Sequence, residues 1–209
     1  MKAFIIYLKE VQSTVDSALE CKRTSREHGI DAWLLEGYTP SRADKFIKEN
    51  NFKPYSPGPK LYDIKWNKPG VRGCFVSHYH AWLKCLDLGH DIIVFEHDAR
   101  IVAEYPTVEF QDVLQLGHNR NGVDDAHDQT PWTEDNTFER KGVNMMDGAH
   151  AYAMTPQGAE KLIDAVQTHG MAPADWHICK TYVDIQVLRP RIALIDPQGS
   201  LTNDRSFAI

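Results

Sequence analysis

Two carboxylates and a histidine follow directly on a run of strand-forming residues in the segment 95–98, Phe-Glu-His-Asp. Because side chains alternate along a strand, an extended backbone would point Glu96 and Asp98 to one side and His97 to the other. Two carboxylates that project together suit a hard divalent cation or a ribose hydroxyl. The same residues also fit a solvated loop in which Asp98 caps a turn, so the segment alone leaves both interpretations open.

The elements that must position these acids alternate between apolar strands and helices. The pattern predicts strands at 3–8, 32–37, 91–95, 112–117, 149–155, 181–188 and 191–196, and helices at 11–28, 40–50, 71–88 and 156–168. Residues 52–70, rich in proline, and 118–141, acidic and poor in aliphatic residues, are expected to be loops. This alternation predicts an α/β sandwich with a largely parallel sheet. Sites in such sheets lie beyond the carboxyl ends of strands, where Glu96 and Asp98 are placed.

Length and composition are those of a globular protein. The 209 residues predict one domain, with a polar tail at 198–209 and a loop at 118–141 that is either functional or disordered. The four cysteines contain no Cys-x-x-Cys pair, which indicates free thiols in a reducing compartment. We find no signal-peptide pattern and no apolar run long enough to span a bilayer, so the expected location is cytoplasmic.

Charge is unevenly distributed over a chain with a net charge of -6. Eight basic and three acidic residues lie between Arg42 and Arg72, whereas twelve acids and two arginines lie between Asp91 and Glu139. Such segregation is typical of a solvated surface. It also suits an acidic, metal-binding half beside a basic lip for an anionic partner.

The segment 73–101, GCFVSHYHAWLKCLDLGHDIIVFEHDARI, resembles the central signature of glycosyltransferase family 25. That family includes bacterial lipooligosaccharide galactosyltransferases and collagen hydroxylysine galactosyltransferases. Its Glu-Asp-Asp strand end is matched at Glu96 and Asp98, whereas His97 replaces the middle acid. The signature before that strand is matched at Gly73, Cys74, Ser77, His78 and Trp82.

Four further blocks are similar to family motifs and keep their order between Gly29 and Asp175. They are HGIDAWLLEGYTP, DVLQLG, GAHAYAMTPQGAEKLI and APADWHI. The N-terminal strand departs from the family, because 7–10 (Tyr-Leu-Lys-Glu) lacks its Asn-Leu-Asp-Arg pattern. The resemblance implies a GT-A-type, Rossmann-like nucleotide-sugar-binding sandwich. It also implies a metal-dependent inverting glycosyltransferase that moves a sugar from a nucleotide-sugar, expected to be a UDP-sugar, to an acceptor hydroxyl on a glycan.

The resemblance assigns roles to particular residues. Asp98 is the expected ligand of Mn²⁺ or Mg²⁺ at the donor diphosphate, with Glu96 and His177 as further ligands. Asp175 is the expected general base, because an inverting enzyme needs a carboxylate to take the acceptor proton. As an alternative, Asp175 caps the helix that follows Pro173.

Donor and acceptor contacts are also expected. The donor-binding candidates are Glu36, Gly37, Gly73, Ser77, His78, Glu96, Asp98 and His150; the acceptor-binding candidates are Asp147, Tyr152 and Asp175. For His78 a packing role is a nearly equal alternative and for His150 it is at least an equal one, and Gly73 is explained by close approach of its backbone to a ligand or a strand.

The acceptor and even catalysis stay open at this point. A hydroxymethylated base in phage-type DNA is an alternative acceptor that suits the basic stretch but not the net negative charge. A non-catalytic module that binds sugar-nucleotides would suit the altered His97. A hydrolase built on Ser77 and His78 is less attractive, because adjacent helical residues face different directions. The sequence does not predict the oligomeric state.

Overall fold

The computed structural model describes residues 1–55, 68–117, 132–133, 137–140, 143–146 and 148–196. Its helices are α1 (Gln12–Glu27), α2 (Pro40–Glu49), α4 (Pro69–Leu88), α5 (Pro156–His169) and α6 (Ala174–His177). Its first strands are β1 (Lys2–Tyr7), β2 (Ala32–Glu36), β3 (Ile92–Glu96), β4 (Ala99–Ile101), β5 (Val113–Gln115) and β6 (Trp132–Thr133). The others are β7 (Thr137–Arg140), β8 (Val143–Met146), β9 (Ala151–Met154), β10 (Ile185–Leu188) and β11 (Ala193–Ile195).

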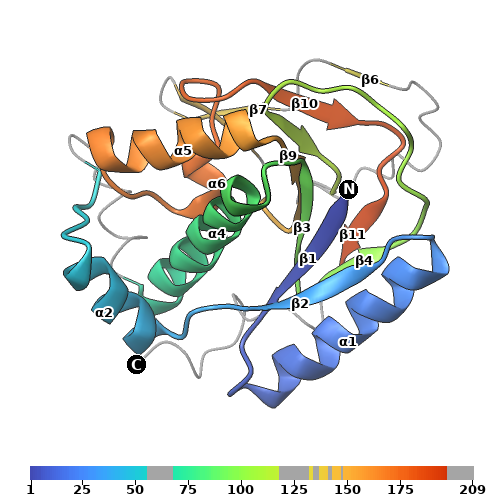
Figure 1. The fold of residues 1–209 in the computed structure, drawn as a ribbon, viewed down its shortest axis with the longest axis horizontal. Coiled ribbons are helices and arrows are strands. Elements are labelled where there is room, and N and C mark those ends of the chain that lie inside the picture. The colour runs from blue at the N-terminus through green and yellow to red at the C-terminus, as the bar shows by residue number, and fades with distance from the viewer. Residues whose placement is uncertain (56–67, 118–131, 134–136, 141–142, 147, 197–209) are drawn as a thin grey trace.

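A seven-stranded sheet in the order β2-β1-β3-β9-β5-β10-β6 forms the centre of the molecule (Figure 1). Strands β2, β1, β3, β5 and β10 run in one direction, while β9 and β6 run in the opposite one. Two-stranded sheets pair β11 with β4 and β7 with β8. The predicted α/β sandwich with a mostly parallel sheet is confirmed, and the antiparallel β9 at its centre is an addition to that prediction.

Helices cover both faces of the sheet, with α2, α4, α5 and α6 on one side and α1 on the other (Figure 1). Alternation along β3 divides its side chains between two cores. Ile92 and Val94 pack with Trp82 of α4, whereas Phe95 packs with Ala18 of α1. Because both faces of β3 are covered, the strand is apolar throughout until Glu96.

The helix ends follow the sequence signals. Gly89 ends α4 in the left-handed region, at φ 64°. The hydroxyl of Thr155 accepts a hydrogen bond from the N–H of Gly158 (3.0 Å) and so caps α5, which has Pro156 at its first position. These predictions are confirmed, as is the end of α5 just before Gly170.

The expected loop 118–141 contains β6 and β7 in its described part, so the prediction of a loop throughout was wrong there. Strands as short and polar as β6 and β7 cannot be distinguished from a loop by periodicity alone. The rest of that loop, residues 56–67 and the tail 198–209 lie outside the described residues.

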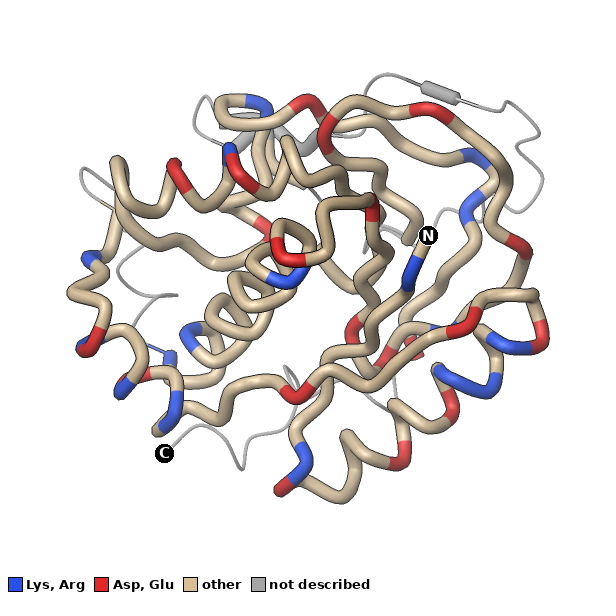
Figure 2. Tube along the Cα trace, in the orientation of Figure 1, with Lys and Arg blue, Asp and Glu red and all other residues tan. Residues whose placement is uncertain are grey.

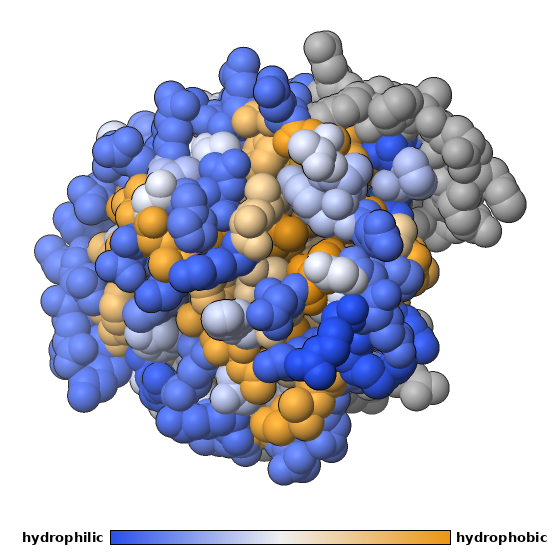
Figure 3. All heavy atoms as spheres, turned by 45° about the vertical axis from the view of Figure 1, so that its right-hand side comes forward, coloured by the Kyte–Doolittle hydropathy of each residue, from blue (hydrophilic) through white to orange (hydrophobic). Residues whose placement is uncertain are grey.

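The surface is mixed in character. Acidic and basic residues alternate along α1 and α2 (Figure 2), and on the face shown in Figure 3 a band of hydrophobic residues is bordered by hydrophilic ones. Among the residues that the structure describes, no helix is long and apolar enough to cross a bilayer.

Candidate active site

Glu96 is the last residue of β3 and faces α4, because it follows Val94 at the strand period of two. Its backbone N–H donates a hydrogen bond to the carbonyl of His150 (2.8 Å), which lies just before β9. Cys74 and His78 are one helical turn apart on α4, so both side chains reach the same point. The site therefore forms where the carboxyl end of β3 meets the first half of α4.

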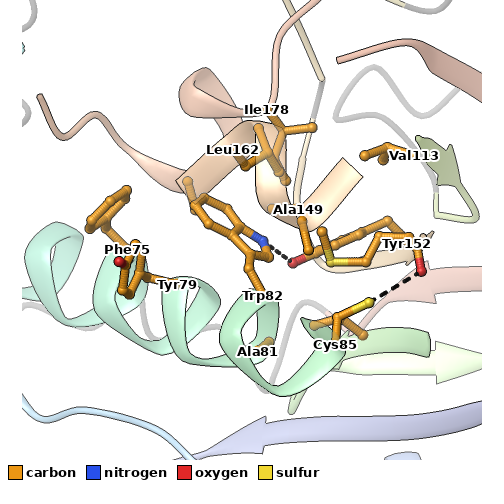
Figure 4. Packing of buried hydrophobic residues seen from close by; sticks show 14 of the residues in the cluster. Phe75, Tyr79, Ala81, Trp82, Cys85, Val113, Ala149, Tyr152, Leu162 and Ile178 are labelled. Carbon is orange, nitrogen blue, oxygen red and sulfur yellow. Dashed lines mark hydrogen bonds between the residues drawn. The ribbon is translucent and has the colours of Figure 1, made fainter. Parts of the chain in front are cut away.

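A chain of hydrogen bonds runs from the core to Glu96. The indole N–H of Trp82 donates to the hydroxyl of Tyr152 (3.0 Å), as Figure 4 shows. That hydroxyl lies 3.0 Å from Nδ1 of His78, whose Nε2 lies 3.0 Å from Oε1 of Glu96. An ionised Glu96 only accepts hydrogen bonds, so a neutral His78 carries its proton on Nε2 and accepts from Tyr152 at Nδ1.

The carboxyl of Glu96 has a pKa below its ordinary value in this setting. Burial alone would raise that pKa, but the hydrogen bond from His78 and, when the ring is protonated, the positive charge of His78 together lower it further than burial raises it. Charge on His150 and His97 acts in the same direction. Glu96 is therefore a carboxylate at neutral pH, and its side chain is 27% exposed.

The thiol of Cys74 lies close to the carboxylate of Glu96. Its Sγ lies 3.6 Å from Oε1 of Glu96. Desolvation raises the pKa of the Cys74 thiol well above its ordinary value, and the charges of Glu96, Asp175 and Asp98 raise it further. Of these three acids, Glu96 is the one with a described contact to Cys74.

Asp98 is almost fully buried, at 7% exposure. Strand β3 ends at Glu96 and the next two residues form a turn, so the alternation expected to align the two acids does not extend to Asp98. The carbonyl of Asp98 accepts a hydrogen bond from the N–H of Asp196 (2.7 Å), which fixes the turn against the end of β11. Its charge raises the pKa of Cys21 on α1 as well as that of Cys74.

Asp175 lies in the first turn of α6 and is partly exposed. The helix is capped by Pro173 and not by Asp175, so the alternative in which Asp175 is the N-cap was wrong.

His177 is packed in the core. Its ring stacks on Trp82 with centroids 5.5 Å apart, and its Nε2 donates to the carbonyl of Leu162 (3.0 Å). Burial lowers the pKa of His177 to about 4, so the ring is neutral at pH 7.

Ligand atoms for a metal gather at one place in the described part of the chain. Cys74, His78 and Glu96 each offer an atom within 4.8 Å of the others. The expected trio of Asp98, Glu96 and His177 forms no such group among the described residues.

Three of the donor-binding candidates pack against each other where β2 meets α4. The N–H of Tyr38 donates to the hydroxyl of Ser77 (2.8 Å), which donates to the carbonyl of Gly73 (2.7 Å). A Cβ on Gly73 would lie 2.7 Å from the carbonyl oxygen of Tyr38, and one on Gly37 would lie 2.9 Å from the hydroxyl of Ser77. Close packing explains Gly37, Gly73 and Ser77, and a contact with the donor stays a prediction for each.

Glu36 ends β2 and forms ion pairs with Lys9 (2.9 Å) and Arg42. The hydrogen bond from Lys9 is the main cause that lowers the pKa of Glu36, followed by that from Arg42. This carboxylate is already balanced by two cations, and its role in donor binding also stays a prediction.

The candidates on and before β9 lie deep in the fold. The ring of His150 covers Gly117, where a Cβ would lie 2.1 Å from its Nε2. Tyr152 has no exposed surface and contacts His78, so its place is that of a support for the site and not of a contact with an acceptor. Asp147 lies outside the described residues.

Cys74 lies beside Glu96 and His78 but was not among the residues predicted for the site. It was noted only as a match to the family signature. The signal that could have found it is its spacing of four from His78, which places both on one helical face.

The sequence as a whole matches a family model. The model described as "Glycosyltransferase family 25 (LPS biosynthesis protein)" matches residues 2–178. The chain belongs to glycosyltransferase family 25. The family resemblance predicted from the motifs is thereby confirmed, and with it the enzyme class.

Relatives of this family 25 chain include an animal enzyme. "Procollagen galactosyltransferase 1-A" of Xenopus laevis is 25% identical over 188 residues, which cover 83% of this chain and 30% of that protein. The chain thus spans less than a third of the length of this relative.

Solved structures with similar folds are more distant. They include the galactosyltransferase LgtC in complex with donor and acceptor sugar analogs (9% identity, TM-score 0.44, covering 90% of this chain and 73% of that one). They also include mouse xyloside xylosyltransferase 1 in its apo form (9% identity, TM-score 0.35, covering 85% and 80%).

Proposed function

We propose that this family 25 chain is a metal-dependent inverting glycosyltransferase of the GT-A type. It transfers a hexose from a UDP-sugar to a hydroxyl of a glycan. The observation that carries the proposal is the position of Glu96 and Asp98 at the carboxyl end of β3, where His78 holds the carboxylate of Glu96. In an α/β sheet this edge is where ligands bind.

Carboxylate oxygens suit a hard cation, and the carboxyl of Glu96, whose pKa lies below its ordinary value, is ionised at neutral pH. Asp98 and Glu96 would hold Mn²⁺ or Mg²⁺, which neutralises the charge of a departing diphosphate when bound. His78 orients the carboxylate of Glu96 through its hydrogen bond, and Tyr152 in turn fixes the His78 ring.

Asp175 is the general base in this proposal. Inversion requires that an acceptor hydroxyl attacks the anomeric carbon from the side opposite the leaving diphosphate, while a carboxylate removes its proton. Asp175 is partly exposed and belongs to α6, whereas Glu96 and Asp98 belong to the end of β3 and the turn after it. The base and the donor side of the site thus come from different elements.

A glycan is preferred over DNA as the acceptor because three of the basic residues in the stretch that suggested DNA lie beside acids of the protein. Arg72 pairs with Asp44 (2.6 Å), Arg42 pairs with Glu36, and Lys45 lies 3.8 Å from Glu49. A glycan also agrees with the lipopolysaccharide role in the family's description.

The proposal is tested first by a donor screen. Purified protein with Mn²⁺ is incubated with UDP-galactose, UDP-glucose and UDP-xylose, without acceptor, and release of UDP is measured before and after EDTA. Metal-dependent UDP release supports a transferase, whereas no release from any donor favours a non-catalytic module. Mass spectrometry with oligosaccharides and hydroxymethylated DNA then identifies the acceptor.

Asp175→Asn tests the base. Since general base catalysis contributes about 10²–10⁴-fold, we expect kcat for transfer to fall by that factor while the donor KM changes little. The matched control is Asp164→Asn on the exposed face of α5, which should keep wild-type kcat. An Asp175→Asn variant with kcat within about twofold of wild type would show that another group takes the proton.

A further inference from the structure

We propose that Cys74, His78 and Glu96 form a second kind of metal site, one for a borderline-soft divalent cation such as Zn²⁺. This site shares Glu96 with the one proposed for the Mn²⁺ or Mg²⁺ ion of the transfer reaction, but it takes a different metal, because hard ions take oxygen ligands and thiolate favours Zn²⁺. The inference does not depend on the transferase activity.

The distances between the ligand atoms fit tetrahedral coordination. Zinc bonds of about 2.3 Å to sulfur and about 2.0 Å to nitrogen and oxygen place tetrahedral ligands about 3.5 Å apart for S···O and about 3.3 Å apart for N···O. Here Sγ of Cys74 lies 3.6 Å from Oε1 of Glu96, and Nε2 of His78 lies 3.0 Å from the same oxygen. The two distances to Glu96 are thus close to those of a tetrahedral site, and the ligand atoms of Cys74 and His78 lie within 4.8 Å of each other.

Helix α4, strand β3 and Tyr152 hold the three ligands in place. Cys74 and His78 project from one face of α4, a rigid helix of 20 residues, and Glu96 ends a strand buried on both faces. When an ion takes Nε2 of His78, the remaining ring proton lies on Nδ1, 3.0 Å from the hydroxyl of Tyr152. A ligating histidine held through its other nitrogen in this way is typical of metal sites.

The charge at the site favours a cation. The charges of Glu96, Asp98 and Asp175, which disfavour a bare thiolate at Cys74, attract a divalent ion to the same point. His78 is buried, whereas Cys74 is exposed and Glu96 is partly exposed. An ion can enter from the side of Cys74, and three protein ligands leave its fourth position open, as in catalytic and exchangeable zinc sites.

Cobalt titration of the full, metal-free chain tests the site directly. Co²⁺ bound by Cys74, His78 and Glu96 should give a thiolate-to-cobalt charge-transfer band and the intense visible bands of tetrahedral cobalt, and Zn²⁺ should displace both. Cys74→Ser should remove the charge-transfer band. Cys21→Ala is the matched control, because Cys21 is buried on α1 and its loss should leave the spectrum unchanged.

A second variant separates ligation from folding. Tyr152→Phe keeps the ring and removes the hydroxyl that holds His78, so Co²⁺ affinity should fall about 10–100-fold with the same spectrum. Absence of a cobalt–thiolate band in the wild type, or its persistence in Cys74→Ser, would overturn the site. Neither donor nor acceptor is needed, so this failure is distinct from failure of the transferase proposal.

Discussion

The imidazole of His177 sits where a positive charge would be costly, between Trp82 and the carbonyl of Leu162. Burial lowers its pKa from 6.5 to about 4, so the unfolded chain binds a proton at this residue between pH 6.5 and 4 and the folded chain does not. The stability from this neutral histidine is complete above pH 6.5 and is lost as the pH falls toward 4. We expect a loss of about 2 kcal/mol between pH 7 and pH 5 from this group.

Urea unfolding at both pH values measures the effect in the wild type and in His177→Phe, which keeps an aromatic ring against Trp82. The variant should lose less stability on acidification, by about 2 kcal/mol. Equal pH dependence in the two proteins would contradict the prediction. If Mn²⁺ stabilised the wild type and not the variant, His177 would instead be the metal ligand that its sequence position suggested.

At the scale of elements, the close approach of α4 to the end of β2 sets the geometry of the site. A Cβ on Gly73 would lie 2.7 Å from the backbone oxygen of Tyr38, so Gly73→Ala must shift α4 or the connection after β2. Alanine gains up to about 1 kcal/mol in helix propensity, but overpacking costs about 1–3 kcal/mol. We expect Gly73→Ala to lower the free energy of unfolding by about 1–2 kcal/mol.

Gly70 offers the control within the same helix. No atom lies within 4 Å of a Cβ built there, so Gly70→Ala should leave stability unchanged or raise it by up to about 1 kcal/mol. Thermal unfolding resolves the difference, because 1 kcal/mol corresponds to about 2–4 °C in a chain of this size. If Gly73→Ala were as stable as Gly70→Ala, the contact would not limit how α4 packs.

Most elements could be predicted because their signals are local. Periodicity placed the helices and apolar strands, and Thr155 with Pro156 marked the start of α5. The direction of β9 could not be predicted, because a buried apolar strand has the same sequence pattern whether its neighbours run parallel or antiparallel to it. The relative orientation of Asp98 and Glu96 could not be predicted, because strand alternation does not indicate that a turn begins directly after Glu96.

The candidate site was less predictable than the fold. Motif resemblance selected Glu96, Asp98 and Asp175. After burial, the charges of all three are causes that raise the pKa of the Cys74 thiol. The bond between His78 and Glu96 depends on how far α4 lies along β3, which is a tertiary relation. A buried histidine such as His177 and a ligating one have the same sequence appearance, and only packing distinguishes them.

At the scale of the whole molecule, charge decides between a glycan and DNA as acceptor. The net charge is -6, and three of the described cations of the stretch 42–72 (Arg42, Lys45 and Arg72) lie beside acids of the same chain. Figure 2 shows acidic and basic residues interspersed along the coloured trace. A phosphate backbone would therefore have to displace existing ion pairs before it gained new ones.

We therefore expect the acceptor KM to change by less than about twofold between 50 and 200 mM salt. An acceptor held through 6–10 phosphate contacts would lose about 10³–10⁵-fold in affinity over that range, because bound counterions are released. Initial transfer rates with a neutral oligosaccharide, at fixed Mn²⁺ and saturating donor, measure the effect, and Arg72→Gln should leave the response flat because Arg72 is paired with Asp44. A steep salt dependence, confined to hydroxymethylated DNA and weakened in Arg72→Gln, would identify DNA as the acceptor and Arg72 as one of its phosphate contacts.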